Sequence, residues 1–115
     1  LLTGNPMIAG VFNRHPDLVL SVVVMGEYRY GLMGSRLRKE VEAQLDALET
    51  ALPILSLDSA SARHYAAIRS ELKEAGHPIP ENDIWIAAQA RQHSVPILSR
   101  DLHFDHVKGI QRLTW

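Results

Sequence analysis

The chain has 115 residues, of which 46% are hydrophobic and 22% charged, and its formal net charge is -1; these values are typical of one globular domain with a single core. It contains no cysteine, which excludes disulfides, thiolate metal sites and a cysteine nucleophile. No apolar stretch approaches the roughly 20 residues that span a bilayer, and no signal-peptide pattern is present, so a cytoplasmic protein without membrane association is expected.

The first residues predict the end of one helix and the start of another. Leu1-Leu2 resembles a last helical turn that Gly4 would end, and Asn5-Pro6 is a good cap for a helix reaching about Arg14. Because a domain seldom begins on the last turn of a helix, we expect residues 1–115 to form a single domain that is incomplete at its N-terminus.

Two helices are predicted in the rest of the first half. Leu18–Ser21 is a short apolar run suited to a buried strand, and Ser21 can cap a helix that carries Glu27 and ends near Leu32. After a break at Gly34-Ser35, apolar residues recur at spacings of three and four from Leu37 to Leu52, which predicts an amphipathic helix. Its apolar stripe could contribute to a homodimer interface or face the core of its own chain.

The second half alternates strands and helices. A buried strand is predicted at Ile54–Leu57, then a helix capped by Asp58 or Ser59 that ends at Gly76. A helix follows from about Glu81 to His93, then a strand at Pro96–Ser99, a turn around Phe104 and an edge strand at Ile110–Trp115. This order predicts an α/β fold with a mostly parallel sheet covered by helices on both faces. Ligands of such sheets bind beyond the carboxyl ends of the strands.

Three acidic residues lie near those strand ends, and we expect Glu27, Asp83 and Asp101 to share one pocket. Converging carboxylates repel each other, by on the order of 4 kcal/mol per pair at 4 Å and an effective dielectric constant near 20. A divalent cation removes this repulsion, and oxygen ligands suit Mg²⁺ or Mn²⁺. The pattern therefore predicts metal-assisted chemistry on a phosphodiester.

Each carboxylate also has a simpler explanation. Asp83 could complement a helix dipole, Asp101 could form a turn, and Glu27 could pair with one of three cations, Arg29, Arg63 or Arg69. Asp105 is expected near the pocket without binding the metal. The run from Asp101 to His106 holds two histidines and two aspartates that could bind zinc, but no other segment supplies further ligands. We therefore expect these histidines to hold no metal.

Three segments resemble the motifs of VapC-type PIN-domain ribonucleases. Leu20–Gly31 is similar to the segment with the second acidic residue of that family, and Pro78–Ala88 to the segment with the third. Pro96–Phe104, with Lys108-Gly109-Ile110 and Trp115, resembles the last motif and tail. The match covers nearly the whole chain, in the order of the family.

The resemblance implies a three-layer α/β/α PIN-like fold and an endoribonuclease dependent on Mg²⁺ or Mn²⁺. It also implies a homodimer and a cognate antitoxin that inhibits it, with Glu27, Asp83 and Asp101 as catalytic metal ligands. One feature departs from the family, whose first strand ends in Asp-x-Asn, with the aspartate as a metal ligand. We expect that strand upstream of Leu1, and residues 1–115 alone could be inactive without its aspartate.

A non-catalytic function remains open. Without the first aspartate, the chain could be a degenerate PIN domain that only binds a partner. The sequence contains no Gly-x-Ser-x-Gly motif of serine hydrolases and no glycine-rich phosphate loop. It does not identify the RNA target, because short acidic motifs do not encode the shape of a substrate groove.

Overall fold

The computed structural model describes residue 14 and residues 17–114. The helix end predicted at Leu1–Gly4 lies outside these residues, as does the following helix except for Arg14, which is helical. The described elements, in chain order, are β1 (Leu20–Ser21), α2 (Val22–Gly31), α3 (Arg38–Ala51), β2 (Ile54–Leu55), α4 (Ser59–Ala75), α5 (Glu81–His93), β3 (Ile97–Leu98), the 3₁₀ helix η1 (Leu102–His106) and β4 (Arg112–Leu113). Strands and helices alternate as predicted, and the α/β class is confirmed.

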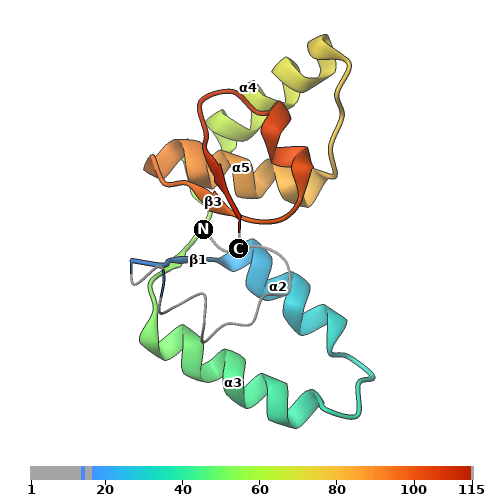
Figure 1. Cartoon of the computed structure of the whole chain (residues 1–115), viewed down its shortest axis with the longest axis vertical. Helices are drawn as coiled ribbons and strands as arrows, with labels where there is room; N and C mark the ends of the chain where they lie inside the picture. Colours follow the sequence, from blue (N-terminus) through green and yellow to red (C-terminus); the bar gives the residue numbers. More distant parts are fainter. Residues whose placement is uncertain (1–13, 15–16, 115) are drawn as a thin grey trace.

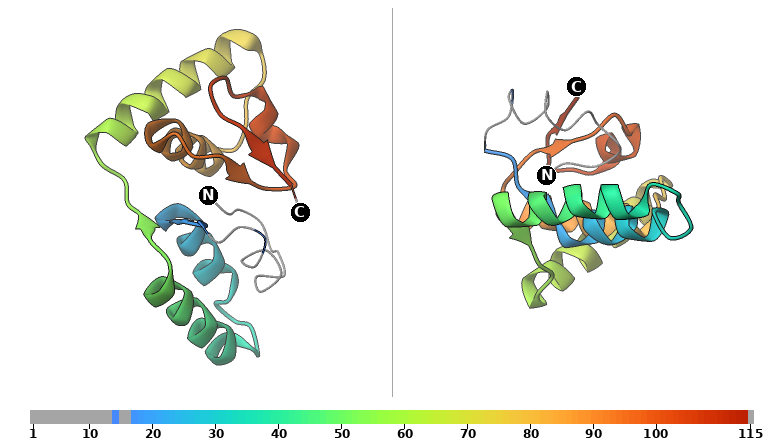
Figure 2. Two further views of the ribbon diagram at one scale, coloured as in Figure 1. Left: turned by 60° about the vertical axis from the view of Figure 1, so that its left-hand side comes forward. Right: turned by 90° about the horizontal axis from the view of Figure 1, so that it is seen from below.

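The strands pair in parallel but are shorter than predicted. β1 pairs with β2, with Leu20 opposite Ile54, and β3 pairs with β4, with Ile97 opposite Arg112. Within residues 17–114 these are two separate two-stranded sheets. Figures 1 and 2 show one group of elements around α2 and α3 and another around α4 and α5. The carboxyl ends of β1 and β3 lead directly into the segments that carry Glu27 and Asp101, whereas Asp83 lies on α5, which follows α4.

Local sequence signals account for the helix ends. The Ser21 side chain accepts a hydrogen bond from the backbone N–H of Val23 and begins α2. Asp58 begins α4 through a capping box with Ser61, in which each side chain accepts a hydrogen bond from the other's backbone N–H. Gly76 ends α4 with φ of 72°, a left-handed conformation that glycine adopts without the steric cost of a Cβ.

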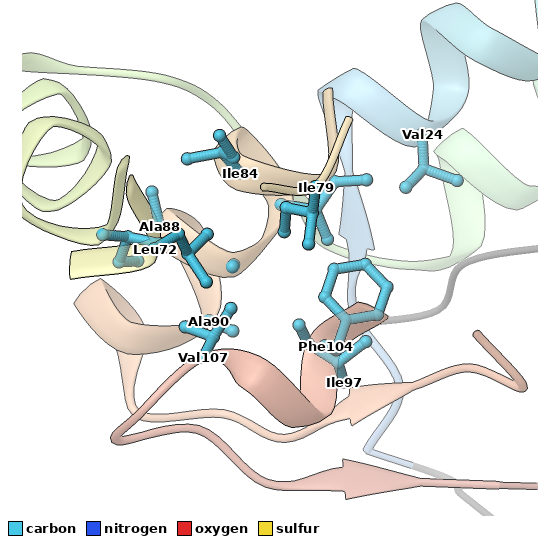
Figure 3. Packing of buried hydrophobic residues seen from close by; sticks show 12 residues of the cluster. Val24, Leu72, Ile79, Ile84, Ala88, Ala90, Ile97, Phe104 and Val107 are labelled. Carbon is cyan, nitrogen blue, oxygen red and sulfur yellow. The ribbon is translucent and has the colours of Figure 1, made fainter. Parts of the chain in front are cut away.

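The larger hydrophobic cluster surrounds α5. Five consecutive residues of this helix, from Ile86 to Ala90, are buried. Leu72 of α4, Ile97 of β3 and Phe104 of η1 pack in the same cluster (Figure 3). Ile68 of α4 also belongs to it. Small alanine side chains allow neighbouring elements to approach the helix closely, so α5 is enclosed on nearly all sides.

A second cluster holds the first half of the chain together. It contains Leu20, Met25, Leu45 and Leu52 and is joined by Leu98 of β3. Val41 and Leu48 of the predicted apolar stripe pack against it, so most of the stripe faces the core of its own chain. None of the helices in the described part of the chain is long and apolar enough to cross a membrane.

Candidate metal centre

Two buried serines order the chain at the ends of β1 and β3. Ser21 is fully buried, and its hydroxyl donates a hydrogen bond to the side-chain carbonyl of Gln89 on α5. Gln89 in turn donates to the backbone oxygen of Leu55, with a distance of 2.9 Å. Ser99 is also buried, and its hydroxyl accepts from the backbone N–H of Asp101 at 3.0 Å. The acidic segments that follow both strands are thus fixed by hydrogen bonds to the strand ends.

Asp83 lies in the first turn of α5. The extended backbone of Pro80, with ψ of 143°, precedes the helix, and the Pro80 carbonyl accepts from the Asp83 backbone N–H at 3.0 Å. The Asp83 side chain is only 17% exposed. Burial raises the pKa of its carboxyl most strongly, and the charge of Asp101 adds to this, while a hydrogen bond from His103 lowers it. A bound cation that compensates the negative charge of Asp83 would therefore be stabilising.

Asp101 begins η1 and faces Asp83. One of its carboxylate oxygens, Oδ1, accepts from the backbone N–H of His103 at 3.0 Å. Phe104, in the same short helix, is 1% exposed and anchors it in the larger cluster. Asp101 is thus held on rigid backbone although its own side chain is 43% exposed.

His103 joins the two aspartates. Its ring nitrogen Nδ1 lies 3.0 Å from Asp101 Oδ1 and 3.3 Å from Asp83 Oδ2. The three residues each offer a ligand atom, and these atoms lie within 4.8 Å of one another. From the sequence, His103 was expected to hold no metal, and its contact with the two aspartates was not predicted. The contact with Asp83 joins residues 20 positions apart, so no local signal in the sequence could have found it.

Glu27 approaches this group from α2. Although Glu27 is an exposed residue, desolvation of its carboxyl raises the pKa of that group most strongly, and the charge of Asp83 raises it further. Two of the cations considered as partners are engaged elsewhere: Arg29 with Asp46 and Glu49, and Arg69 with Glu81. The charges of Glu27 and Asp83 repel each other, but Glu27 lies outside the group of three residues whose ligand atoms are within 4.8 Å of one another.

Asp105 and His106 have other partners. Both oxygens of Asp105 accept from the guanidinium of Arg112, at 2.7 and 3.1 Å, and this contact lowers the pKa of the Asp105 carboxyl. His106 stacks on His77 with ring centroids 4.3 Å apart. These contacts leave Glu27, Asp83, Asp101 and His103 as the candidate metal ligands among the described residues.

The donor set fits a divalent cation. Asp83 and Asp101 converge although burial and the nearby charge of Asp101 raise the pKa of the Asp83 carboxyl, and the charges of Glu27 and Asp83 repel each other. A bound cation relieves this repulsion, and carboxylate oxygens suit Mg²⁺ and Mn²⁺. Such ions polarise phosphodiesters and lower the pKa of bound water. The arrangement is therefore chemically suited to hydrolysis of a phosphodiester.

Known proteins share this sequence and fold. A family model, PIN domain, matches residues 7–110. Ribonuclease VapC5 of Mycobacterium tuberculosis is 32% identical over 97 residues, covering 82% of this chain and 72% of that protein. The tRNA(fMet)-specific endonuclease VapC of Shigella flexneri is 28% identical and covers 85% of this chain and 75% of its own length. The crystal structure of DNA-bound VapBC from Salmonella typhimurium superposes with a TM-score of 0.85 and 26% identity, covering 96% of this chain and 86% of that one. The chain therefore belongs to the PIN-domain family, as a VapC-type member with the α/β/α fold predicted from its sequence.

Proposed function

We propose that this protein is an endoribonuclease toxin of a toxin–antitoxin pair, and that Glu27, Asp83 and Asp101 are its catalytic metal ligands. The observation that carries the proposal is the convergence of Asp83 and Asp101, whose carboxylates share His103 as a partner at 3.3 and 3.0 Å. Helix-dipole or turn roles explain either aspartate alone, but not the approach of the two. The relatives named above include ribonucleases and an endonuclease, which supports the same reaction class.

The protein's own residues have separable tasks in this reaction. Mg²⁺ or Mn²⁺, when bound, would polarise the phosphodiester and activate a water molecule. Asp83, on the enclosed helix α5, and Asp101, which caps η1, supply carboxylates from two rigid parts of the backbone. Glu27 supplies a third from α2 and, being exposed, lies toward the solvent from which RNA arrives. Single-stranded RNA is the substrate class we propose, because unpaired strands expose their backbone and bases to such a site.

Protein partners are part of the proposal. Structures similar to this chain are complexes named VapBC, and one is named FitAcB, which supports a cognate antitoxin as partner. Three apolar side chains remain exposed around the turn between α2 and α3: Tyr30 at 81%, Met33 at 55% and Leu37 at 55%. Such a patch is suited to protein contact. We propose that it contributes to a homodimer, and light scattering that shows a monomer at micromolar concentration in physiological salt would contradict this.

RNA cleavage by the Asp83→Asn variant tests the metal site. The change preserves side-chain size but removes an anionic ligand, so cation-dependent cleavage of single-stranded RNA should be lost while circular dichroism shows a folded protein. Glu81→Gln is the matched control, because Glu81 is the other acidic residue in the first turn of α5 and is engaged by Tyr65 and Arg69. That variant should cleave as the wild type does.

The outcomes separate three explanations. Equal cleavage by both variants would reduce Asp83 to a helix-dipole partner and contradict its metal role. Loss in Asp83→Asn alone supports the proposal. A wild-type protein that binds its antitoxin but cleaves no RNA with Mg²⁺ or Mn²⁺ would instead support the non-catalytic binding module. Sequencing the 5′ ends of RNA from cells expressing the protein would then identify the target.

A further inference from the structure

His103 lies beside both aspartates, with one ring nitrogen close to a carboxylate oxygen of each. Its Nδ1 is 3.0 Å from Asp101 Oδ1 and 3.3 Å from Asp83 Oδ2. The side chain is 47% exposed, so hydrophobic burial does not account for this placement. Because Nδ1 faces the carboxylates, the opposite ring nitrogen, Nε2, is directed away from them.

Backbone contacts hold His103 in place. Its N–H donates to Asp101 Oδ1 at 3.0 Å, the same oxygen that lies close to its ring. The next residue, Phe104, is buried in the larger cluster. The Asp-x-His segment is therefore a short chelate-like loop with a fixed start and a fixed end, in which little conformational freedom is lost when a ligand binds.

The spacing of the donor atoms matches that around a small divalent ion. In octahedral coordination with ligands about 2.1 Å from the metal, adjacent donor atoms lie about 3.0 Å apart. The distances from His103 Nδ1 to the two carboxylate oxygens, 3.0 and 3.3 Å, are close to this value. Both distances also suit hydrogen bonds, so the imidazole could either bind the ion or act only as a counter-charge in its absence.

We propose that His103 Nδ1 is a nitrogen ligand of the cation held by Asp83 and Asp101, and that the centre consequently favours Mn²⁺, Co²⁺ or Ni²⁺ over Mg²⁺. An imidazole suits later first-row ions, whereas Mg²⁺ selects oxygen donors. The inference rests on the proposed metal-dependent function and deepens it, since it assigns a fourth residue and a preference among cations. If His103 only paired with the carboxylates, its removal would strengthen cation binding, because both carboxylates would be free for any cation. If His103 is a ligand, its removal weakens cation binding.

Pulsed electron paramagnetic resonance of bound Mn²⁺ tests this directly. Protein without a polyhistidine tag, stripped of metal with EDTA, would be loaded with Mn²⁺. We expect a ¹⁴N coupling typical of coordinated imidazole in the wild type and its loss in His103→Ala and His103→Gln. His93→Ala is the matched control, because His93 is an exposed histidine at the opposite end of α5 from Asp83; it should keep the coupling.

Affinities provide a second readout. Calorimetry should show that His103→Ala weakens Ni²⁺ binding about tenfold or more, with a much smaller change for Mg²⁺. Wild-type protein that binds Mn²⁺ without a ¹⁴N coupling, or a variant that binds Ni²⁺ as tightly as or more tightly than the wild type, would overturn the assignment of His103 while leaving the carboxylate centre intact. Failure of the wild type to bind any of these cations would overturn the proposed metal centre itself, and the His103 ligand with it.

Discussion

The two halves of the molecule pack their helices differently. In the first region, residues 18–55, α3 buries only Leu45, and its other apolar residues are at most half-buried. In the second region, residues 59–113, α5 buries Ile84 and the five residues from Ile86 to Ala90. A helix covered on one side is free to take part in protein contacts, whereas a helix covered nearly all round is fixed in position. The first region therefore offers a surface for protein partners, and the second holds candidate catalytic side chains in fixed positions.

The candidate metal centre draws on both regions unequally. Asp83, Asp101 and His103 belong to the rigid second region, and Glu27, on α2 of the first, interacts electrostatically with Asp83. Two buried apolar residues cross between the regions: Val24 of α2 packs in the larger cluster, and Leu98 of β3 packs in the smaller one. The position of Glu27 relative to the aspartates therefore depends on how well the regions are joined.

The largest effect is expected from Phe104→Ala. Phe104 is 1% exposed in the larger cluster, and truncating a buried phenylalanine costs about 3–5 kcal/mol of the free energy of unfolding. η1 would also lose its anchor, so cation binding should weaken. Urea denaturation measures the first effect. Leu102→Ala, at a neighbouring side chain that is 64% exposed, should change stability by less than about 0.5 kcal/mol. Equal losses in the two variants would contradict a rigid second region.

A somewhat smaller effect is expected from Gln89→Met, which cuts the polar link between the regions. Gln89 accepts from Ser21 and donates to the Leu55 carbonyl, so the substitution leaves two polar groups without their partner in a buried site. We expect a loss of about 2–3 kcal/mol. Gln44→Met, at an exposed position of α3, is the control. Unchanged stability of the Gln89 variant would show that the regions are joined by apolar packing alone.

Capping signals explain why the elements could be predicted. Ser21, Asp58 and Gly76 act within a few residues of their own position in the chain, so the sequence fixes these helix ends locally. Strand lengths were predicted less well, since a run such as Ile54–Leu57 shows apolar character but not how many residues find a partner. The contact of His103 with Asp83 joins residues 20 positions apart. Only the packing of η1 against α5 creates it, and the histidine itself gave no local signal.

Substitution of two glycines by alanine should change the stability of the protein in opposite directions. Gly76 ends α4 with φ of 72°, so Gly76→Ala should cost about 1 kcal/mol, the penalty of a left-handed conformation for a residue with a Cβ. Gly26 lies inside α2, where an added Cβ meets no described atom within 4 Å. Gly26→Ala should stabilise the protein by roughly 0.5–1 kcal/mol through the lower entropy of the unfolded chain. Thermal unfolding measures both, and a shared sign would contradict the backbone explanation.

The smallest effect concerns the charge of Asp83 in metal-free protein. Burial raises the pKa of this carboxyl above its ordinary value of 3.8, so the folded state binds the Asp83 proton more tightly than the unfolded state does. At neutral pH both states are ionised and the folded state bears the full cost of the buried charge. As pH falls through the raised pKa toward 3.8, the folded state takes up its proton first and the cost disappears. Asp83→Asn should therefore melt slightly above the wild type at pH 7 in EDTA, and this advantage should vanish in acid.

Asp105→Asn should behave in the opposite way. The contact with Arg112 lowers the pKa of the Asp105 carboxyl, so its charge stabilises the folded state at neutral pH, and this contribution is lost as pH falls through the lowered pKa. The Asn variant should melt below the wild type at pH 7 and approach it in acid. Melting temperatures of the two variants between pH 7 and pH 3 thus compare two carboxylates. The charge of Asp83 is disfavoured by burial, whereas that of Asp105 is stabilised by Arg112. If Asp83→Asn also melted below the wild type at pH 7 in EDTA, His103 would already compensate the charge of Asp83, and the repulsion that a cation is proposed to relieve would be absent.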